Sequence, residues 1–190
     1  LRILSRKLEK TDVVLEIGSC TGFVSTFISK KIGFKNVTAV EPNPEMIKII
    51  NLFRKWNYEN FSVINGIVTD KESVDFYIND IIFSSATRKR TNTKKVVKVK
   101  GYTLAKIYSS FKFNFLVLDM EGEEYNLLIS NQFPPSLKKI LIEFHGIKKH
   151  SGVKDNLYSE LIQKLTLNNF LEVKSLSEGR VKYFEKLEKH

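Results

Sequence analysis

A glycine-bearing turn and two carboxylates near the start of the chain have residue types and spacing that suit a nucleotide-binding site. The turn, residues 18–22, follows an apolar run and precedes a stretch with helical spacing, so its backbone N–H groups can approach a ligand closely. Glu16 stands just before the turn, and Glu41 ends the next apolar run. A carboxylate at the carboxyl end of such a strand can accept hydrogen bonds from both hydroxyls of a ribose. The pattern therefore predicts a site for a nucleotide cofactor.

Two details favour S-adenosylmethionine over a dinucleotide. Dinucleotide sites carry Gly-x-Gly-x-x-Gly, and Cys20 and Phe23 occupy the second and third glycine positions of that fingerprint. The carboxylate of Glu16 suits the ammonium of S-adenosylmethionine better than a pyrophosphate, although it could instead be a capping or salt-bridge acid. We expect the cofactor to contact the following residues: Glu16, Gly18, Ser19, Cys20, Gly22, Glu41, Pro42, Asn65, Gly66, Ile67 and Asp119. No role for the side chain of Cys20 follows from the sequence.

A second group of acidic and histidine residues follows two later apolar runs. Asp119 and Glu121 come after one run, and Glu143 and His145 end the other. Methyl transfer from a sulfonium mainly needs alignment and exclusion of water, but a hydroxyl acceptor must also lose its proton. Asp119 is expected near the methyl donor, with Glu121 or His145 as the general base and Glu143 as a further catalytic candidate. A structural histidine and an acid at a helix N-terminus are the alternatives for these two bases.

The same carboxylates could bind a divalent cation, because hard cations prefer oxygen ligands. No ligand spacing in the sequence requires one. From the sequence we therefore predict no metal, and we assign the role of general base to a side chain.

Alternating apolar runs and helical segments must position these residues. In the first third of the chain they give the order strand, helix, strand, helix, strand, which a parallel sheet with crossover helices explains most simply. Asn43 as cap and Pro44 in the first helical turn mark the start of the second helix. The expected strands are residues 12–18, 36–40 and 61–64, and the expected helices are residues 22–31 and 44–56.

The rest of the chain continues the pattern with one insertion. Residues 73–78 and 94–100 alternate as strands do and flank a polar loop at 84–93, so they predict an inserted antiparallel pair. Further strands are expected at 113–119 and 140–144, a hairpin at 170–176 and 181–184, and helices at 1–9, 103–110, 123–130 and around Leu157, Leu161 and Leu165. The predicted fold is α/β, a doubly wound Rossmann-like sheet. It is mostly parallel, with a C-terminal antiparallel hairpin and the inserted pair, in a single domain of residues 1–190.

Charge and composition leave the partner open. The 190 residues carry a formal net charge of +10, and residues 81–118 contain no Asp or Glu but nine Lys or Arg. A basic patch from Arg88 to Lys100 could attract RNA or an anionic acceptor, or it could be a solvated loop and strand face. No apolar run approaches the roughly 18 residues that cross a bilayer. A single cysteine excludes an internal disulfide, and we expect a cytoplasmic location.

Several motifs resemble those of known methyltransferases. Residues 14–22 (VLEIGSCTG) resemble the first motif of class I methyltransferases, and residues 39–44 (AVEPNP) resemble the second. More narrowly, the chain resembles the FkbM family, which follows its glutamate with Pro-x-Pro. Residues 119–124 match the family's Asp-x-Glu-Gly-x-Glu, with Glu124 as the last acid, and residues 143–145 match its Glu-x-His. The resemblance covers about residues 12–145.

The resemblance implies an S-adenosylmethionine-dependent methyltransferase, with a hydroxyl of a small molecule or a sugar as acceptor. The chain departs from the family at Glu16 and Cys20, where Asp and Asn are usual, and at Leu104-Ala105, where the family has Leu-Asp. Two alternatives remain. One is an RNA methyltransferase that uses the basic stretch, although the chain has no Asn-Pro-Pro-Tyr type tetrapeptide and no recognisable RNA-binding module. The other is a non-catalytic protein that binds S-adenosylmethionine.

Overall fold

The computed structural model describes residues 1–79, 87, 93–145 and 152–187, and the side chains from 157 onward in the last range. A seven-stranded sheet with the order β3-β2-β1-β7-β8-β10-β9 forms its centre. The first five strands in this order are parallel, and β10 runs antiparallel to both β8 and β9. The strands are β1 (Val14–Ile17), β2 (Val37–Glu41), β3 (Ser62–Asn65), β7 (Phe115–Leu118), β8 (Lys139–Glu143), β9 (Phe170–Glu172) and β10 (Val181–Lys186). This architecture confirms the predicted doubly wound sheet with its C-terminal antiparallel hairpin.

Both faces of the sheet are covered, which is why the central strands are mostly apolar. Val14 and Phe115 point into one core cluster, whereas Leu15 and Leu116 point into the other. The first cluster includes α1 (Arg2–Lys7), α2 (Phe23–Ile32) and α3 (Pro44–Asn57), and the second includes α4 (Leu104–Ser110), α5 (Glu124–Ser130) and α6 (Gly152–Leu167). A short 3-10 turn, Phe34–Asn36, leads into β2.

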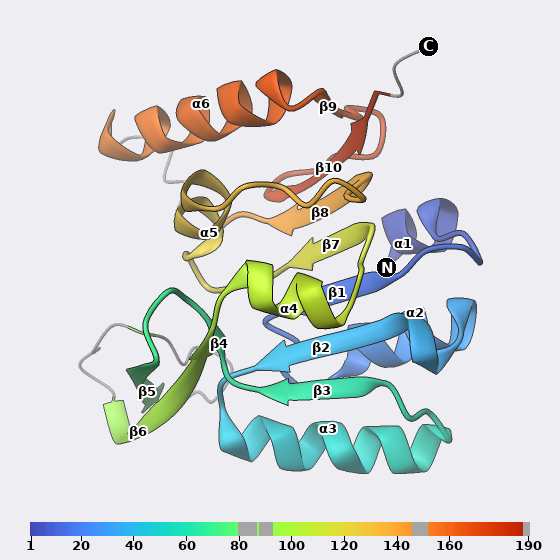
Figure 1. Cartoon of the computed structure of the whole chain (residues 1–190), viewed down its shortest axis with the longest axis vertical. Helices are drawn as coiled ribbons and strands as arrows, with labels where there is room; N and C mark the ends of the chain where they lie inside the picture. The colour runs from blue at the N-terminus through green and yellow to red at the C-terminus, as the bar shows by residue number, and fades with distance from the viewer. Residues whose placement is uncertain (80–86, 88–92, 146–151, 188–190) are drawn as a thin grey trace.

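The predicted insertion is also present. Strands β5 (Ser73–Asn79) and β6 (Thr93–Tyr102) pair antiparallel, and β4 (Ile67–Val68) runs parallel to the end of β6. Figure 1 shows this small sheet beyond the arrowheads of β2 and β3, so it faces the carboxyl ends of the central strands. Most of the expected polar loop at 84–93, including Arg88, Lys89 and Arg90, lies outside the described residues.

Some predicted boundaries were wrong for identifiable reasons. The strand expected at 12–18 begins only at Val14, because the N–H of Val13 bonds to the side chain of Asn114 and not to a neighbouring strand. The strand expected at 170–176 ends at Glu172, because the chain turns where the N–H of Leu176 bonds to the carbonyl of Val173. Within the described residues, no helix is both long and apolar enough to span a bilayer.

Candidate functional site

A cavity of about 190 Å³ opens at the carboxyl ends of β1, β2 and β7, where the chain order of the sheet reverses. This is the place where open α/β sheets bind ligands. The described residues that line the cavity include four carboxylates and neither Lys nor Arg. Those carboxylates are Glu41, Asp119, Glu121 and Glu123. The wall therefore suits a ligand with positive charge.

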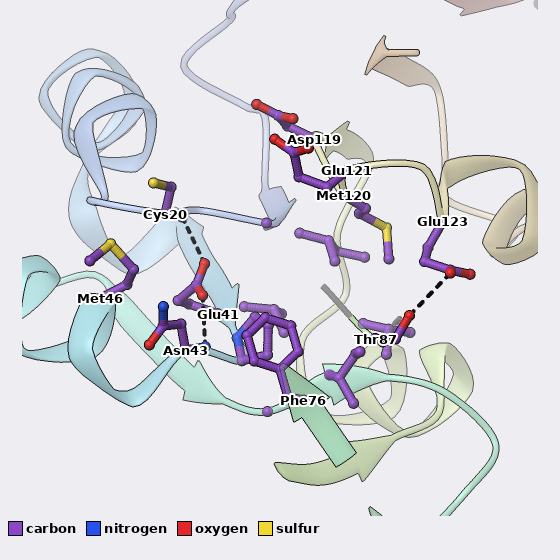
Figure 2. Close-up of a pocket in the computed structure, with 17 residues that line it drawn as sticks. Cys20, Glu41, Asn43, Met46, Phe76, Thr87, Asp119, Met120, Glu121 and Glu123 are labelled. Carbon is purple, nitrogen blue, oxygen red and sulfur yellow. Dashed lines mark hydrogen bonds between the residues drawn. The ribbon is translucent and has the colours of Figure 1, made fainter. Parts of the chain in front are cut away.

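Glu41 is held with both carboxylate oxygens already oriented. Oε2 accepts a hydrogen bond of 2.8 Å from the N–H of Cys20, and Oε1 accepts one of 2.7 Å from the N–H of Asn43 (Figure 2). Asn43 in turn caps α3, because its Oδ1 accepts from the N–H of Glu45. Burial raises the pKa of Glu41 to about 7. Since a carboxylate accepts about four hydrogen bonds, its two oxygens retain room for two ribose hydroxyls.

The structure gives Cys20 a backbone role. The residue has a φ of 49°, and this left-handed conformation aims its N–H at Glu41. Its side chain contributes to the cavity wall. Burial, with the negative charge of Glu41, raises the pKa of the thiol to about 11, so the thiol stays protonated and is a poor nucleophile at neutral pH.

Glu16, which was expected to contact the cofactor, does not line the cavity. It is buried, and its Oε2 accepts a hydrogen bond from the hydroxyl of Ser25 in α2. Burial raises the pKa of Glu16 to about 8, so the carboxyl is largely protonated at neutral pH. The structure thus favours the interpretation of Glu16 as an internal acid over that of an ammonium partner.

The other predicted cofactor residues divide into two groups. Cavity-lining residues among them are Gly18, Cys20, Glu41, Pro42, Gly66, Ile67 and Asp119. Ser19, Gly22 and Asn65 do not line the cavity. Ser19 and Gly22 are buried, whereas Asn65 is exposed and its side-chain N–H donates to the carbonyl of Glu41.

Two of the lining glycines are required by the packing of the protein itself. A Cβ at Gly18, which has a φ of 87°, would lie 1.7 Å from the carbonyl oxygen of Asp119. A Cβ at Gly66 would lie 2.5 Å from the ring of Tyr102. The absence of a side chain at Gly66 therefore makes room for Tyr102 of β6, whether or not a ligand also approaches there.

The predicted catalytic residues come together beside the cavity. His145 follows β8, and its Nε2 lies 3.6 Å from Oδ1 of Asp119, 3.9 Å from Oε1 of Glu121 and 3.9 Å from Oε1 of Glu143. Burial opposes a charge on the ring, but the hydrogen bond and charge of Glu124, with Asp119 and Glu121, raise the pKa of His145 above 6.5. Burial and the charge of Glu143 raise the pKa of Asp119 to about 6.

Three of these residues could together bind a cation. One ligand atom each of Asp119, Glu121 and His145 lie within 4.8 Å of one another. The expected absence of a metal therefore stays a prediction.

Several cavity residues were not predicted from the sequence. They are Met46, Val68, Phe76, Thr87, Met120 and Glu123, together with Ile17, Val40 and Asn43. Thr87 donates from Oγ1 to Oε1 of Glu123 over 3.1 Å, which joins the inserted segment to the loop after β7 (Figure 2). Phe76 lies on the inward side of β5, which strand alternation could have indicated.

The cavity fits S-adenosylmethionine on three counts. Glu41 offers an oriented acceptor pair for a ribose diol. Met46, Ile67, Val68 and Phe76 supply apolar walls for a base. The carboxylates of Asp119 and Glu121, which Figure 2 shows together across the cavity from Glu41, suit the positive sulfonium and ammonium groups.

Solved methyltransferase structures share the fold. The FkbM methyltransferase from Methylobacillus flagellatus KT aligns over 97% of this chain and 46% of its own, with a TM-score of 0.60 and 15% identity. A ribosomal protein L11 methylase from Lactobacillus delbrueckii subsp. bulgaricus aligns over 98% of this chain and 75% of its own, with a TM-score of 0.54 and 13% identity. The fold is thus that of the Rossmann-like methyltransferases.

Sequence comparison gives the family. Residues 12–172 match the model of the methyltransferase FkbM domain, and the chain therefore belongs to the FkbM methyltransferase family, whose class uses S-adenosylmethionine. A curated relative, ribosomal RNA small subunit methyltransferase A from Mesomycoplasma hyopneumoniae (strain 232), is 26% identical over 141 residues. The match covers 74% of this chain and 49% of the relative, so the chain spans about half the length of that protein.

Proposed function

We propose that this domain methylates a hydroxyl of a small molecule or a sugar. The observation that carries the proposal is the imidazole of His145, whose Nε2 lies among three carboxylates beside the cavity. Asp119 and Glu121 line that cavity, so an acceptor that meets Nε2 also meets the cofactor site. Hydroxyl-rich molecules suit such a surface because carboxylates accept hydrogen bonds from O–H groups.

The side chains have separate roles in the proposed reaction. Ionised Glu41 binds the ribose hydroxyls, and the apolar wall around Met46 and Phe76 excludes water from the base. S-adenosylmethionine would supply a methyl group activated by its sulfonium. An O–C bond to the acceptor would form as the C–S bond breaks, with the electron pair of that bond left on sulfur. Nε2 of His145 takes the proton of the acceptor hydroxyl. The neighbouring carboxylates of Asp119 and Glu121 stabilise the imidazolium that results.

An RNA acceptor is the second candidate, and two observations favour it. A curated relative bears the name of a ribosomal RNA methyltransferase. Exposed lysines also lie along β6. Against it, the described wall of the cavity carries no Lys or Arg that could bind a phosphate. A non-catalytic cofactor-binding role is the third candidate.

One experiment separates the three candidates. The protein is incubated with S-adenosylmethionine labelled in the methyl group, with pooled hydroxyl-bearing small molecules and sugars in one arm and ribosomal RNA in the other. Label in a small molecule or sugar that depends on His145 supports the proposal. Label in RNA alone would assign the second candidate. Cofactor binding without transfer to either pool would favour the third.

A further inference from the structure

Glu124 is fully buried beneath the candidate site, at the first residue of α5. Its Oε1 accepts hydrogen bonds from the N–H of Met120 at 2.8 Å and from the N–H of Gly122 at 3.2 Å. The same oxygen lies 2.9 Å from Nδ1 of His145. One carboxylate oxygen thus joins the loop after β7 to the imidazole that follows β8.

These contacts fix the tautomer of His145. Oε1 of Glu124 already accepts hydrogen bonds from two N–H groups. A proton on the Glu124 carboxyl would therefore reside on Oε2 and not on Oε1. The short Nδ1 contact therefore needs Nδ1 to be the donor. In the neutral ring, Nε2 is then the nitrogen with the free lone pair.

The lone pair of Nε2 faces the candidate active site. Asp119, Glu121 and Glu143 surround Nε2 at 3.6–3.9 Å, distances that exceed a hydrogen bond. Arg180 adds a positive charge beside this group, because its Nη2 lies 3.4 Å from Oε1 of Glu143.

The loop depends on the same oxygen. The bonds to Met120 and Gly122 flank Glu121, which has a φ of 55°. Glu124 therefore holds both the backbone that carries the Glu121 carboxylate and the ring that faces it.

We propose that Glu124 is the positioning residue of the site: it holds His145 as the Nδ1–H tautomer and presents Nε2 to the acceptor hydroxyl. The inference rests on the proposed function for the role of Nε2 as proton acceptor. The arrangement also places a buried negative charge against the ring when His145 becomes protonated.

Nitrogen NMR of the whole chain tests the tautomer directly. The sequence contains only three histidines, and a His145→Gln variant assigns the signals of His145 by their loss. Above the pKa of the ring, we expect a protonated-type shift for Nδ1 and an unprotonated-type shift for Nε2. The opposite tautomer in the unmodified protein would overturn the inference, and this measurement needs no variant of Glu124 and no acceptor.

A Glu124→Gln variant tests the charge. Glutamine retains an acceptor oxygen for the loop but removes the negative charge, so the pKa of His145 should fall by about one unit in the NMR titration. Glu178→Gln, an exposed acid paired with Arg2, is the matched control and should leave this pKa unchanged. An unchanged pKa in Glu124→Gln would contradict a positioning role.

The two proposals can fail separately. Full methyl transfer by His145→Gln would contradict the proposed function, because Nε2 would then not be the base. The wild-type tautomer would still decide whether Glu124 fixes the ring. Conversely, the wrong tautomer would remove the role of Glu124 even if His145 proved essential for transfer.

Discussion

The cavity at the carboxyl ends of the central strands and the outer face of the β5–β6 pair differ in charge, although they share a strand pair. Four carboxylates line the described part of the cavity, and Phe76 of β5 belongs to its wall. The opposite side of the same pair exposes Lys98 and Lys100, which alternate along β6 with Val97 and Val99, and Lys94 is exposed near the start of the strand. The net charge of +10 is therefore a property of the surface and not of the site. A ligand chosen by net charge alone would be an anion, whereas the cavity suits a cation.

We expect the largest effect from the loss of His145, which lies beside the acidic cavity. His145→Ala should reduce methyl transfer by about 10²–10⁴-fold, because positioned general bases contribute that much. The affinity for S-adenosylmethionine should stay within about twofold, since His145 does not line the cavity. Transfer rates and calorimetric binding constants measured on one preparation separate the two quantities. Unchanged transfer would show that His145 is not the general base.

Glu41→Gln should weaken cofactor binding by roughly 30-fold, about 2 kcal/mol, because hydrogen bonds to a charged acceptor are worth about 1.5–3 kcal/mol each. Glu45→Gln is the control, since this exposed acid on α3 pairs with Lys48 outside the cavity. Binding in the unmodified protein should strengthen as pH rises through about 7, when Glu41 ionises. The Gln variant should lose this pH dependence. Equal affinities of the Glu41 variant and the control would contradict the ribose role.

A substitution at Glu16 tests whether this buried carboxyl is protonated and so adds no negative charge beside the cavity. Its folded-state pKa is raised to about 8, so folding favours the protonated carboxyl. Its contribution to stability is present below about 4.5 and is lost as pH rises towards 8. Between pH 5 and 8.5 the wild type should lose roughly 3–4 kcal/mol more stability than Glu16→Gln in urea unfolding. Parallel pH profiles for the two proteins would show that Glu16 is not held protonated.

The smallest effect is expected at the basic face. Replacement of Lys94, Lys98 and Lys100 by Gln should change the affinity for S-adenosylmethionine by less than about twofold, because exposed charges are screened. Any binding of RNA should weaken and lose part of its salt dependence. A tenfold loss of cofactor affinity would show that the two regions are coupled.

The positions of the site residues could largely be predicted from the sequence. Buried parallel strands read as apolar runs, and side chains that follow such runs gather at one edge of the sheet. That rule alone brings Glu41, Asp119 and Glu121 to the cavity, and places His145 beside them. The cofactor class followed from the missing fingerprint glycines and from the motifs of the family.

The directions of side chains could not be predicted in the same way. Glu16 turns to Ser25, a contact between a strand and a helix that no spacing in the sequence specifies. Thr87 reaches the cavity through the bond to Glu123 across the fold. The role of Glu124 depends on the turn at Glu121 and Gly122, both of which have a positive φ.

Hydrogen exchange with and without S-adenosylmethionine tests whether the carboxylate-lined cavity, and not the basic face, binds the cofactor. We expect slower exchange in peptides covering residues 18–22, 41–46, 66–68 and 119–123, each of which contains residues that line the cavity. Residues 94–100 of β6 should exchange unchanged, because none of them lines it. Slower exchange confined to residues 94–100, or no change in the four cavity segments at saturating cofactor, would contradict binding in the cavity.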